Sequence, residues 1–271
     1  MSVLPLFLES DPTRDRALGM VIGAVHGAQA ARRLAPGGLD WPQAEDVLLH
    51  LSESLVELDE LRPTDLVRRL VGAWAAQAGR PSLIRTVAAG YRPQTSSAWV
   101  AGLAPICCRR QGDQRTAQFE AAQLAKTFNA APAEGEAMEV CSRYLRQAIL
   151  TGDRKRALVA FDWAGDRRVR RLTEGRSLPL NPECDLVAAL DQARAAALCH
   201  VAFPVVLEAL VTVRAEPAAL ILAGMLVGAL EGRAPFLNTG PTHQSTRLEL
   251  AIDRLLHRAK QPRASNTAVL E

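Results

Sequence analysis

AALILAGMLVGALEG, residues 218–232, is an apolar stretch in which Gly224, Gly228 and Gly232 recur every four residues. This spacing places the glycines on one side of an α-helix, where the missing side chains let a second helix approach closely. Each glycine inside a helix costs about 1 kcal/mol relative to alanine, so tight packing has to compensate. The stretch therefore predicts a buried helix with a close helical neighbour.

A second helix with the same glycine spacing is predicted over residues 11–33. Asp11 is a suitable N-cap residue, and Pro12 suits the first helical position because its missing N–H needs no partner there. The glycines again lie four residues apart, at Gly19, Gly23 and Gly27. We expect this helix also to pack closely against another helix.

Apolar residues at helical spacing predict further helices along the whole chain. The predicted ranges are 40–57, 63–79, 82–90, 98–108, 115–128, 132–150, 153–163, 182–203, 204–213 and 244–260. Residues 165–182 mix charged residues, Gly and Pro, and are predicted to form the longest irregular connection. The fold class is therefore all-α, with one compact domain over residues 1–260 and a disordered tail over 261–271.

The composition excludes several classes of protein. Aromatic residues make up 4% of the 271 residues and hydrophobic residues 48%, which favours tightly packed helices over a β-sandwich. The net charge is only +3 and is spread along the chain, so no nucleic-acid or membrane partner is expected. The densest basic run, Arg167 to Arg171, is interpreted as a solvated face or loop, with an anion contact as the lesser alternative.

The cysteines argue against a zinc site and against a disulfide framework. There are five of them, an odd number, and none forms a C-x-x-C pair with nearby histidines: Cys107, Cys108, Cys141, Cys184 and Cys199. We expect a reducing, cytoplasmic environment. The adjacent Cys107 and Cys108 are interpreted as small apolar side chains in an Ala-rich helix rather than as nucleophiles.

Four segments, taken in order, carry a resemblance to a known family. They are residues 16–30, 49–55 and 97–105, and the glycine-spaced stretch 218–232. In sequence, order and spacing they are similar to segments of the ADP-ribosylglycohydrolases, which include the dinitrogenase-reductase-activating glycohydrolases. The resemblance implies a compact orthogonal helical bundle in which a metal-dependent hydrolase site lies between the first and last core helices.

The metal-ligand positions of that family are changed in this chain. Family members hold paired magnesium ions with carboxylate and hydroxyl oxygens, whereas the matching positions here lack side-chain oxygens at Ala28, Pro42, Ala44, Ala215, Pro217 and Ala218. Side-chain oxygens remain only at Gln43, Glu45 and Glu216. Because hard cations need several oxygen ligands each, we expect no dimagnesium site and no cofactor.

A ligand site without metal is still implied at the same place. Ser96 and Ser97 carry hydroxyls at a predicted helix start, and Arg214 could hold a phosphate. Asn129 matches a polar family position after Thr127 and Phe128. The predicted ligand-binding residues are His26, Gln43, Glu45, Ser96, Ser97, Asn129, Arg214 and Glu216. Asp46 and His50, four residues apart, are interpreted as a surface pair.

Two functions from different classes remain open. The first is a pseudoenzyme that binds a phosphorylated or ADP-ribose-like ligand, or a protein partner. The second is a repurposed enzyme that uses the cleft for metal-independent hydrolysis or rearrangement of another small molecule, with catalytic residues that the sequence does not identify. A third, weaker possibility is a metal site that the comparison of segments misses.

Overall fold

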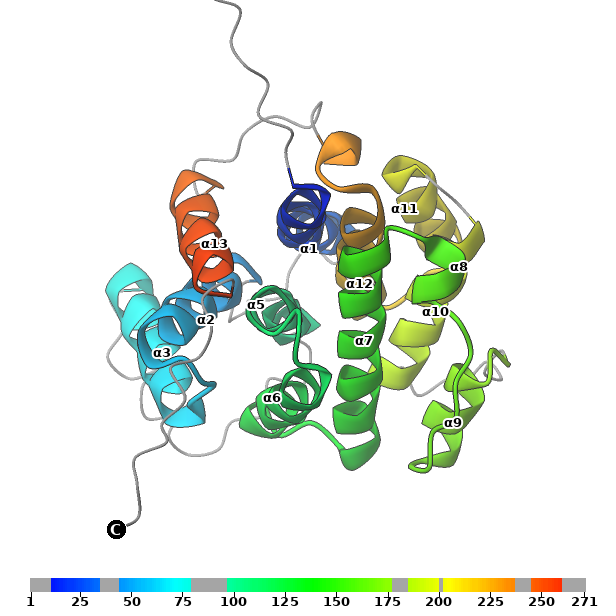
Figure 1. The fold of residues 1–271 in the computed structure, drawn as a ribbon, viewed down its shortest axis with the longest axis horizontal. Helices are drawn as coiled ribbons and strands as arrows, with labels where there is room; N and C mark the ends of the chain where they lie inside the picture. The colour runs from blue at the N-terminus through cyan, green and yellow to red at the C-terminus, as the bar shows by residue number, and fades with distance from the viewer. Residues whose placement is uncertain are drawn as a thin grey trace, which may run out of the picture.

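The computed structural model describes residues 11–34, 44–78, 97–176, 185–199, 202–236 and 245–259. Every regular element within these ranges is a helix, which confirms the predicted all-α class (Figure 1). In the same ranges no helix combines the length and apolar character needed to cross a membrane. The predicted helix 82–90 and the predicted tail 261–271 lie outside the described residues.

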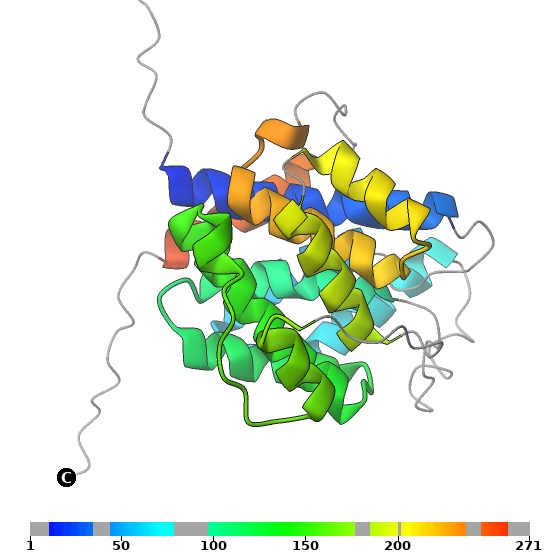
Figure 2. The same ribbon diagram turned by 90° about the vertical axis from the view of Figure 1, so that its right-hand side faces the viewer.

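The centre of the fold is the antiparallel pair of α1 (Pro12–Leu34) and α12 (Pro217–Glu231), which lie side by side in both views (Figures 1 and 2). A Cβ atom built on Gly228 would lie 2.0 Å from the carbonyl oxygen of Gly19. Glycine is therefore required on both helices, and the predicted close neighbour of each helix is the other.

Helix α12 is the most buried element of the chain. All its residues from 218 to 230 are buried, because α1, α7 (Pro132–Thr151) and α10 (Leu186–Cys199) pack around it. Helix α11 (Phe203–Thr212) contacts its outer side. An apolar helix without a polar face is stable in water only when surrounded in this way.

A second group of helices lies on the other side of α1 (Figure 1). It contains α2 (Ala44–Leu58), α3 (Pro63–Ala78), α5 (Leu103–Arg109), α6 (Gln114–Thr127) and α13 (Ser245–Ala259). Helix α13 packs against α2 and α5, so the end of the described chain covers an early helix. Where they can be compared, these helix bounds differ from the predicted ones by a few residues; residues 40–43, the predicted start of the second helix, lie outside the described residues.

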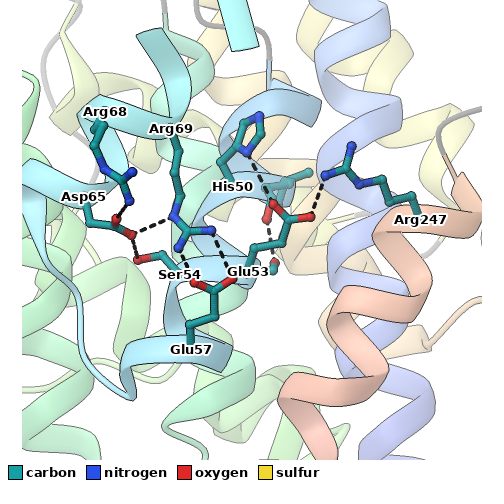
Figure 3. A network of polar contacts seen from close by, with 10 residues as sticks. His50, Glu53, Ser54, Glu57, Asp65, Arg68, Arg69 and Arg247 are labelled. Atoms are coloured by element: carbon teal, nitrogen blue, oxygen red, sulfur yellow. Dashed lines mark hydrogen bonds and ion pairs between the residues drawn. The ribbon is translucent and has the colours of Figure 1, made fainter. Parts of the chain in front are cut away.

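Asp65 joins α2 to α3 through hydrogen bonds (Figure 3). Its Oδ2 accepts from the hydroxyl of Ser54 at 2.8 Å and from Nε of Arg69 at 2.6 Å. Arg69 also pairs with Glu57. Burial raises the pKa of Asp65, but bonds from Arg68, Ser54 and Arg69 outweigh it and lower this pKa to about 2. This network holds the two helices together.

Glu53 joins α2 to α13 in the same view (Figure 3). Its carboxylate lies 2.8 Å from Nη2 of Arg247 and 3.4 Å from Nδ1 of His50. His50 thus has an acidic neighbour three residues further along α2. These contacts have a structural role, since they connect helices that are far apart in the sequence.

A buried ion pair holds the helices around α5. Arg110 and Glu120 are each about 4% exposed and form two parallel bonds, Nη2 to Oε1 at 2.7 Å and Nε to Oε2 at 3.0 Å. The N–H of Leu61 also donates to Glu120, and Nε of Arg146 donates to the carbonyl oxygen of Arg110 at 2.7 Å. The pair therefore links the α2–α3 turn, α6 and α7.

The predicted helix 98–108 is divided into a 3₁₀ helix, η1 (Ser97–Gly102), followed by α5. A Cβ on Gly102 would approach Leu124 to 2.8 Å and Leu51 to 3.1 Å. The backbone thus lies directly on the side chains of α6 and α2 at this point. We attribute the tighter first turns to this close packing.

Two predictions are wrong between residues 153 and 176, whereas residues 177–182 of the predicted connection lie outside the described residues. Only α8 (Arg154–Ala157) forms where a helix to 163 was predicted, because the segment beyond it is held by contacts with other elements. The N–H of Phe161 donates to Thr173, and Nε1 of Trp163 donates to Glu136 at 2.8 Å. The expected irregular connection contains α9 (Arg167–Thr173), which is capped by Asp166.

Candidate ligand-binding site

Three helix ends meet on one side of the fold. Because α1 and α12 are antiparallel, the end of α1 lies beside the start of α12: a Cβ on Gly27 would lie 2.3 Å from the carbonyl oxygen of Leu220. The start of α2 joins this region through an ion pair between Arg32 and Glu45. The 3₁₀ helix η1 packs against both α2 and α12.

The Arg32–Glu45 pair is the main polar contact of this region. Nη2 of Arg32 donates to Oε1 of Glu45, whose side chain is only 9% exposed. The second oxygen, Oε2, is buried and has no hydrogen-bond partner among the described residues. The sequence prediction missed Arg32. Its position one helical turn after Ala28 was the available signal, since residues four apart share a helix face.

His26 takes part in an aromatic cluster. Its ring stacks on Phe236 of η2 (Ala234–Phe236) at 5.4 Å and 1°, and meets the edge of Phe203 at 6.4 Å. Burial, followed by the charge of Arg33, lowers the pKa of His26. The imidazole is therefore neutral at neutral pH, which suits packing between phenylalanines.

Arg214 and Glu216 precede α12. Arg214 is exposed and has a φ of 52°, in the left-handed region, where it ends the turn after α11. Glu216 is half-buried at the N-cap position, but its side chain makes no capping hydrogen bond. Arg33 is exposed at the end of α1. Two exposed arginines thus lie at the end of the α1–α12 pair where Arg32 and Glu45 interact.

The remaining predicted ligand residues are less informative. Ser97 starts η1, but its side chain, together with Gln43 and Ser96, lies outside the described part of the chain. Asn129 is exposed with a φ of 55°, and its N–H donates to the carbonyl oxygen of Lys126 at 3.0 Å. It therefore ends α6, a frequent role of asparagine in the left-handed conformation.

A stacked pair connects the end of α6 to η1. The rings of Trp99 and Phe128 lie 5.7 Å apart and nearly parallel, at 13°. Trp99 is 8% exposed, so its side of the stack is buried.

A solved structure described as an "ADP-ribosylglycohydrolase-related protein complex" matches the chain with a TM-score of 0.71. The match covers 91% of this chain and 99% of that chain. The chain has the ADP-ribosylglycohydrolase fold. The sequence identity is 20%, so the match concerns the fold alone. No protein-family model matches the sequence, and no curated protein sequence matches it significantly.

The alanines at the metal-ligand positions implied by the sequence resemblance face the apolar core. Ala28, Ala44 and Ala218 are 5%, 2% and 7% exposed, and Ala215 packs against the same core. Pro217 is the first residue of α12. Within the described ranges, no three His, Cys, Asp or Glu side chains are grouped so that they could hold a metal ion.

The three cysteines in the core are not accessible for nucleophilic chemistry. Cys107, Cys108 and Cys141 are fully buried. Burial raises the pKa of Cys107 to about 12 and raises those of the other two well above the usual thiol value. Since the thiolate is the reactive form, these thiols are apolar packing groups, as predicted for Cys107 and Cys108.

Proposed function

We propose that the chain is a pseudoenzyme that binds a phosphorylated, ADP-ribose-like ligand without metal ions. The observation that carries the proposal is the ion pair between Arg32 and Glu45. A guanidinium group already neutralises the carboxylate at a position where the fold family places metal ligands. The ligand would bind beside this pair, at the ends of α1, α2 and α12.

The described side chains do not fit a dimagnesium centre. Each magnesium ion prefers about six oxygen ligands in octahedral geometry. Ala28, Ala44 and Ala218 are buried among apolar side chains and offer none. Glu45 shares one oxygen with Arg32, and its other oxygen is enclosed. No hydrolytic step through a metal is therefore assigned.

The charges at this end support a phosphorylated ligand. Arg33 and Arg214 are exposed, and the Arg32 side chain is 37% exposed despite its contact with Glu45. Guanidinium groups bind phosphate through parallel charge-assisted hydrogen bonds. The choice of an ADP-ribose-like compound rests on the likeness of fold to an ADP-ribosylglycohydrolase-related protein.

The same contacts favour binding over metal-independent catalysis. A general acid–base pair needs two titratable groups that face a bound substrate. His26 is packed between two phenylalanines, and Glu45 is held by Arg32. These two titratable groups are therefore engaged in structural contacts.

Calorimetric titration with ADP-ribose in the presence of a chelator tests the proposal. We expect binding in the chelator and no change on adding magnesium. Arg214→Glu should weaken binding about tenfold, because a phosphate contact is replaced by repulsion. Arg62→Glu, an exposed change on the α2–α3 turn, is the matched control and should leave binding unchanged.

Two outcomes would overturn the proposal. The first is the absence of ADP-ribose binding, or binding that requires magnesium. The second is release of ADP-ribose from an ADP-ribosylated arginine substrate by the wild-type chain at a rate that Arg214→Glu abolishes. Either result would point to a working hydrolase site or to a different ligand.

A further inference from the structure

The segment 153–176 carries more positive charge than the whole chain. It contains eight lysines and arginines against four aspartates and glutamates, a formal +4, whereas the chain as a whole is +3. The rest of the chain is therefore slightly acidic. The cations lie on α8, on α9 and at Arg176, whereas the connection between the two helices contains no lysine or arginine and carries Asp162 and Asp166.

Some of these cations are neutralised by neighbouring helices. Arg154 pairs with Glu231 at 2.8 Å, and Arg168 pairs with Asp185. Arg170 and Arg176 share Glu174 at 3.9 and 3.4 Å. Four further cations have no ion pair among the described residues, and we call them the basic surface: Lys155, Arg156, Arg167 and Arg171.

The arginines of α9 are held in place by the fold. Arg167 and Arg171 lie four residues apart and so share one helix face, where like charges repel. Val169 and Leu172 are fully buried beneath them. The N–H of Asp166 also donates to Glu136 at 2.7 Å, which fixes the start of the helix. An anionic group between the two guanidinium groups would remove their repulsion.

The two halves of the basic surface lie at opposite ends of α7 (Figures 1 and 2). α9 is anchored near Glu136, whereas α8 follows Thr151 directly. At 1.5 Å per residue the two places are about 22 Å apart along α7, which an extended peptide of about seven residues spans. Val159, in the connection between the two halves, is 54% exposed.

We propose that the basic surface docks an extended acidic segment of another protein. Carboxylates of the segment would bridge Arg167 and Arg171 at one end and contact Lys155 and Arg156 at the other. An apolar side chain between them would cover Val159. This exposed valine favours a protein segment over a nucleic acid, whose backbone offers phosphates but no apolar side chain at this spacing.

Fluorescence anisotropy of the full chain with labelled peptides tests the proposal. The main ligand is a glutamate-rich peptide of about ten residues with leucines at intervals, and the short ligand is a glutamate peptide of about four residues. We expect the long peptide to bind at least about tenfold more tightly, because only it reaches both halves. Its affinity should fall with rising salt as the charges are screened.

Charge reversal locates the binding. The triple variant Arg156→Glu/Arg167→Glu/Arg171→Glu should abolish binding of the long peptide. The matched control Arg115→Glu/Lys126→Glu/Arg254→Glu makes the same charge change on exposed residues of α6 and α13 and should retain most of the affinity. Circular dichroism checks that both variants remain folded.

Three results would overturn the proposal. One is equal loss of binding in both triple variants, which would indicate net charge alone. Another is equal affinity for the long and short peptides. The third is binding of single-stranded RNA or of phosphatidylserine vesicles to the wild-type chain without binding of the acidic peptide. None of these measurements depends on ADP-ribose, so this proposal and the proposed function fail separately.

Discussion

Gly23 and Gly224 face each other where α1 crosses α12, and a Cβ atom on either residue would lie 2.0 Å from the carbonyl oxygen of the other. Real Cβ atoms do not approach a backbone oxygen so closely. The two main chains are therefore in direct contact, and this contact brings the end of α1 to the start of α12, where Arg32 and Glu45 interact.

Replacing Gly23 by alanine should destabilise the protein by about 3 kcal/mol, because backbone atoms of α12 cannot move away without separating the helices. Urea denaturation measures the change. Gly72→Ala in α3 is the matched control. A Cβ there meets nothing within 4 Å, so stability should rise by up to about 1 kcal/mol from the better helix propensity of alanine. Equal effects of the two changes would contradict the packing described for α1.

Asp65 should make the free energy of unfolding depend on pH in the acidic range. Its pKa is lowered from 3.8 to about 2 in the folded chain, so its contribution of about 2 kcal/mol is complete above pH ~4 and is lost as the pH falls towards ~2. Denaturation curves of wild type and Asp65→Asn should therefore differ at pH ~6 and converge near pH ~2. Glu208→Gln, a change on the exposed side of α11, is the control. Its denaturation curves should match those of wild type at both pH values. A pH-independent difference for Asp65→Asn would count against the network in Figure 3.

Removing only one partner of the buried pair of Arg110 and Glu120 should strongly destabilise the fold. Glu120→Leu leaves the guanidinium of Arg110 buried without its partner, and a loss of about 3–5 kcal/mol is expected. The double variant Arg110→Met/Glu120→Leu should be less destabilised than Glu120→Leu alone, because no uncompensated charge remains. If the double variant were the less stable one, the packing of this region would depend on hydrogen bonds rather than on charge.

Cysteine labelling should divide the thiols into two groups. Iodoacetamide at pH ~8 should modify Cys199 in the native chain, since the reagent can reach this exposed thiol. Cys107, Cys108 and Cys141 should react only after denaturation, because burial raises their pKa values. Mass spectrometry of the digested protein identifies the labelled sites. Native labelling of Cys107 at the rate of Cys199 would show that α5 is accessible.

The sequence was sufficient for the helices whose signals are local. Asp11 and Pro12 mark the start of α1, and the glycine spacing marks the α1–α12 contact, because both patterns depend on residues within a few positions of one another. The region after residue 153 was predicted wrongly for the opposite reason. Trp163 bonds to Glu136, 27 positions earlier, and this long-range contact ends the helical pattern after Ala157.

Only part of the structure around the candidate site was predictable from the sequence. The changed positions Ala28 and Glu45 pointed to the ends of α1 and α2. Arg32, the partner of Glu45, resembled an ordinary solvated arginine in the last turn of a helix, because its contact crosses a segment of thirteen residues. His26 was predicted to bind ligand, whereas its ring stacks on Phe236, 210 positions later, which no local pattern indicates.

The most direct test of the central claim is a titration of the chain with manganese, up to several ions per chain, in which electron paramagnetic resonance measures the free ion. Manganese replaces magnesium at oxygen sites and is visible when free. The account predicts that the free-ion signal is undiminished, because Arg32 neutralises Glu45 and the buried alanines offer no oxygen. Loss of the signal with two manganese ions bound per chain would contradict it.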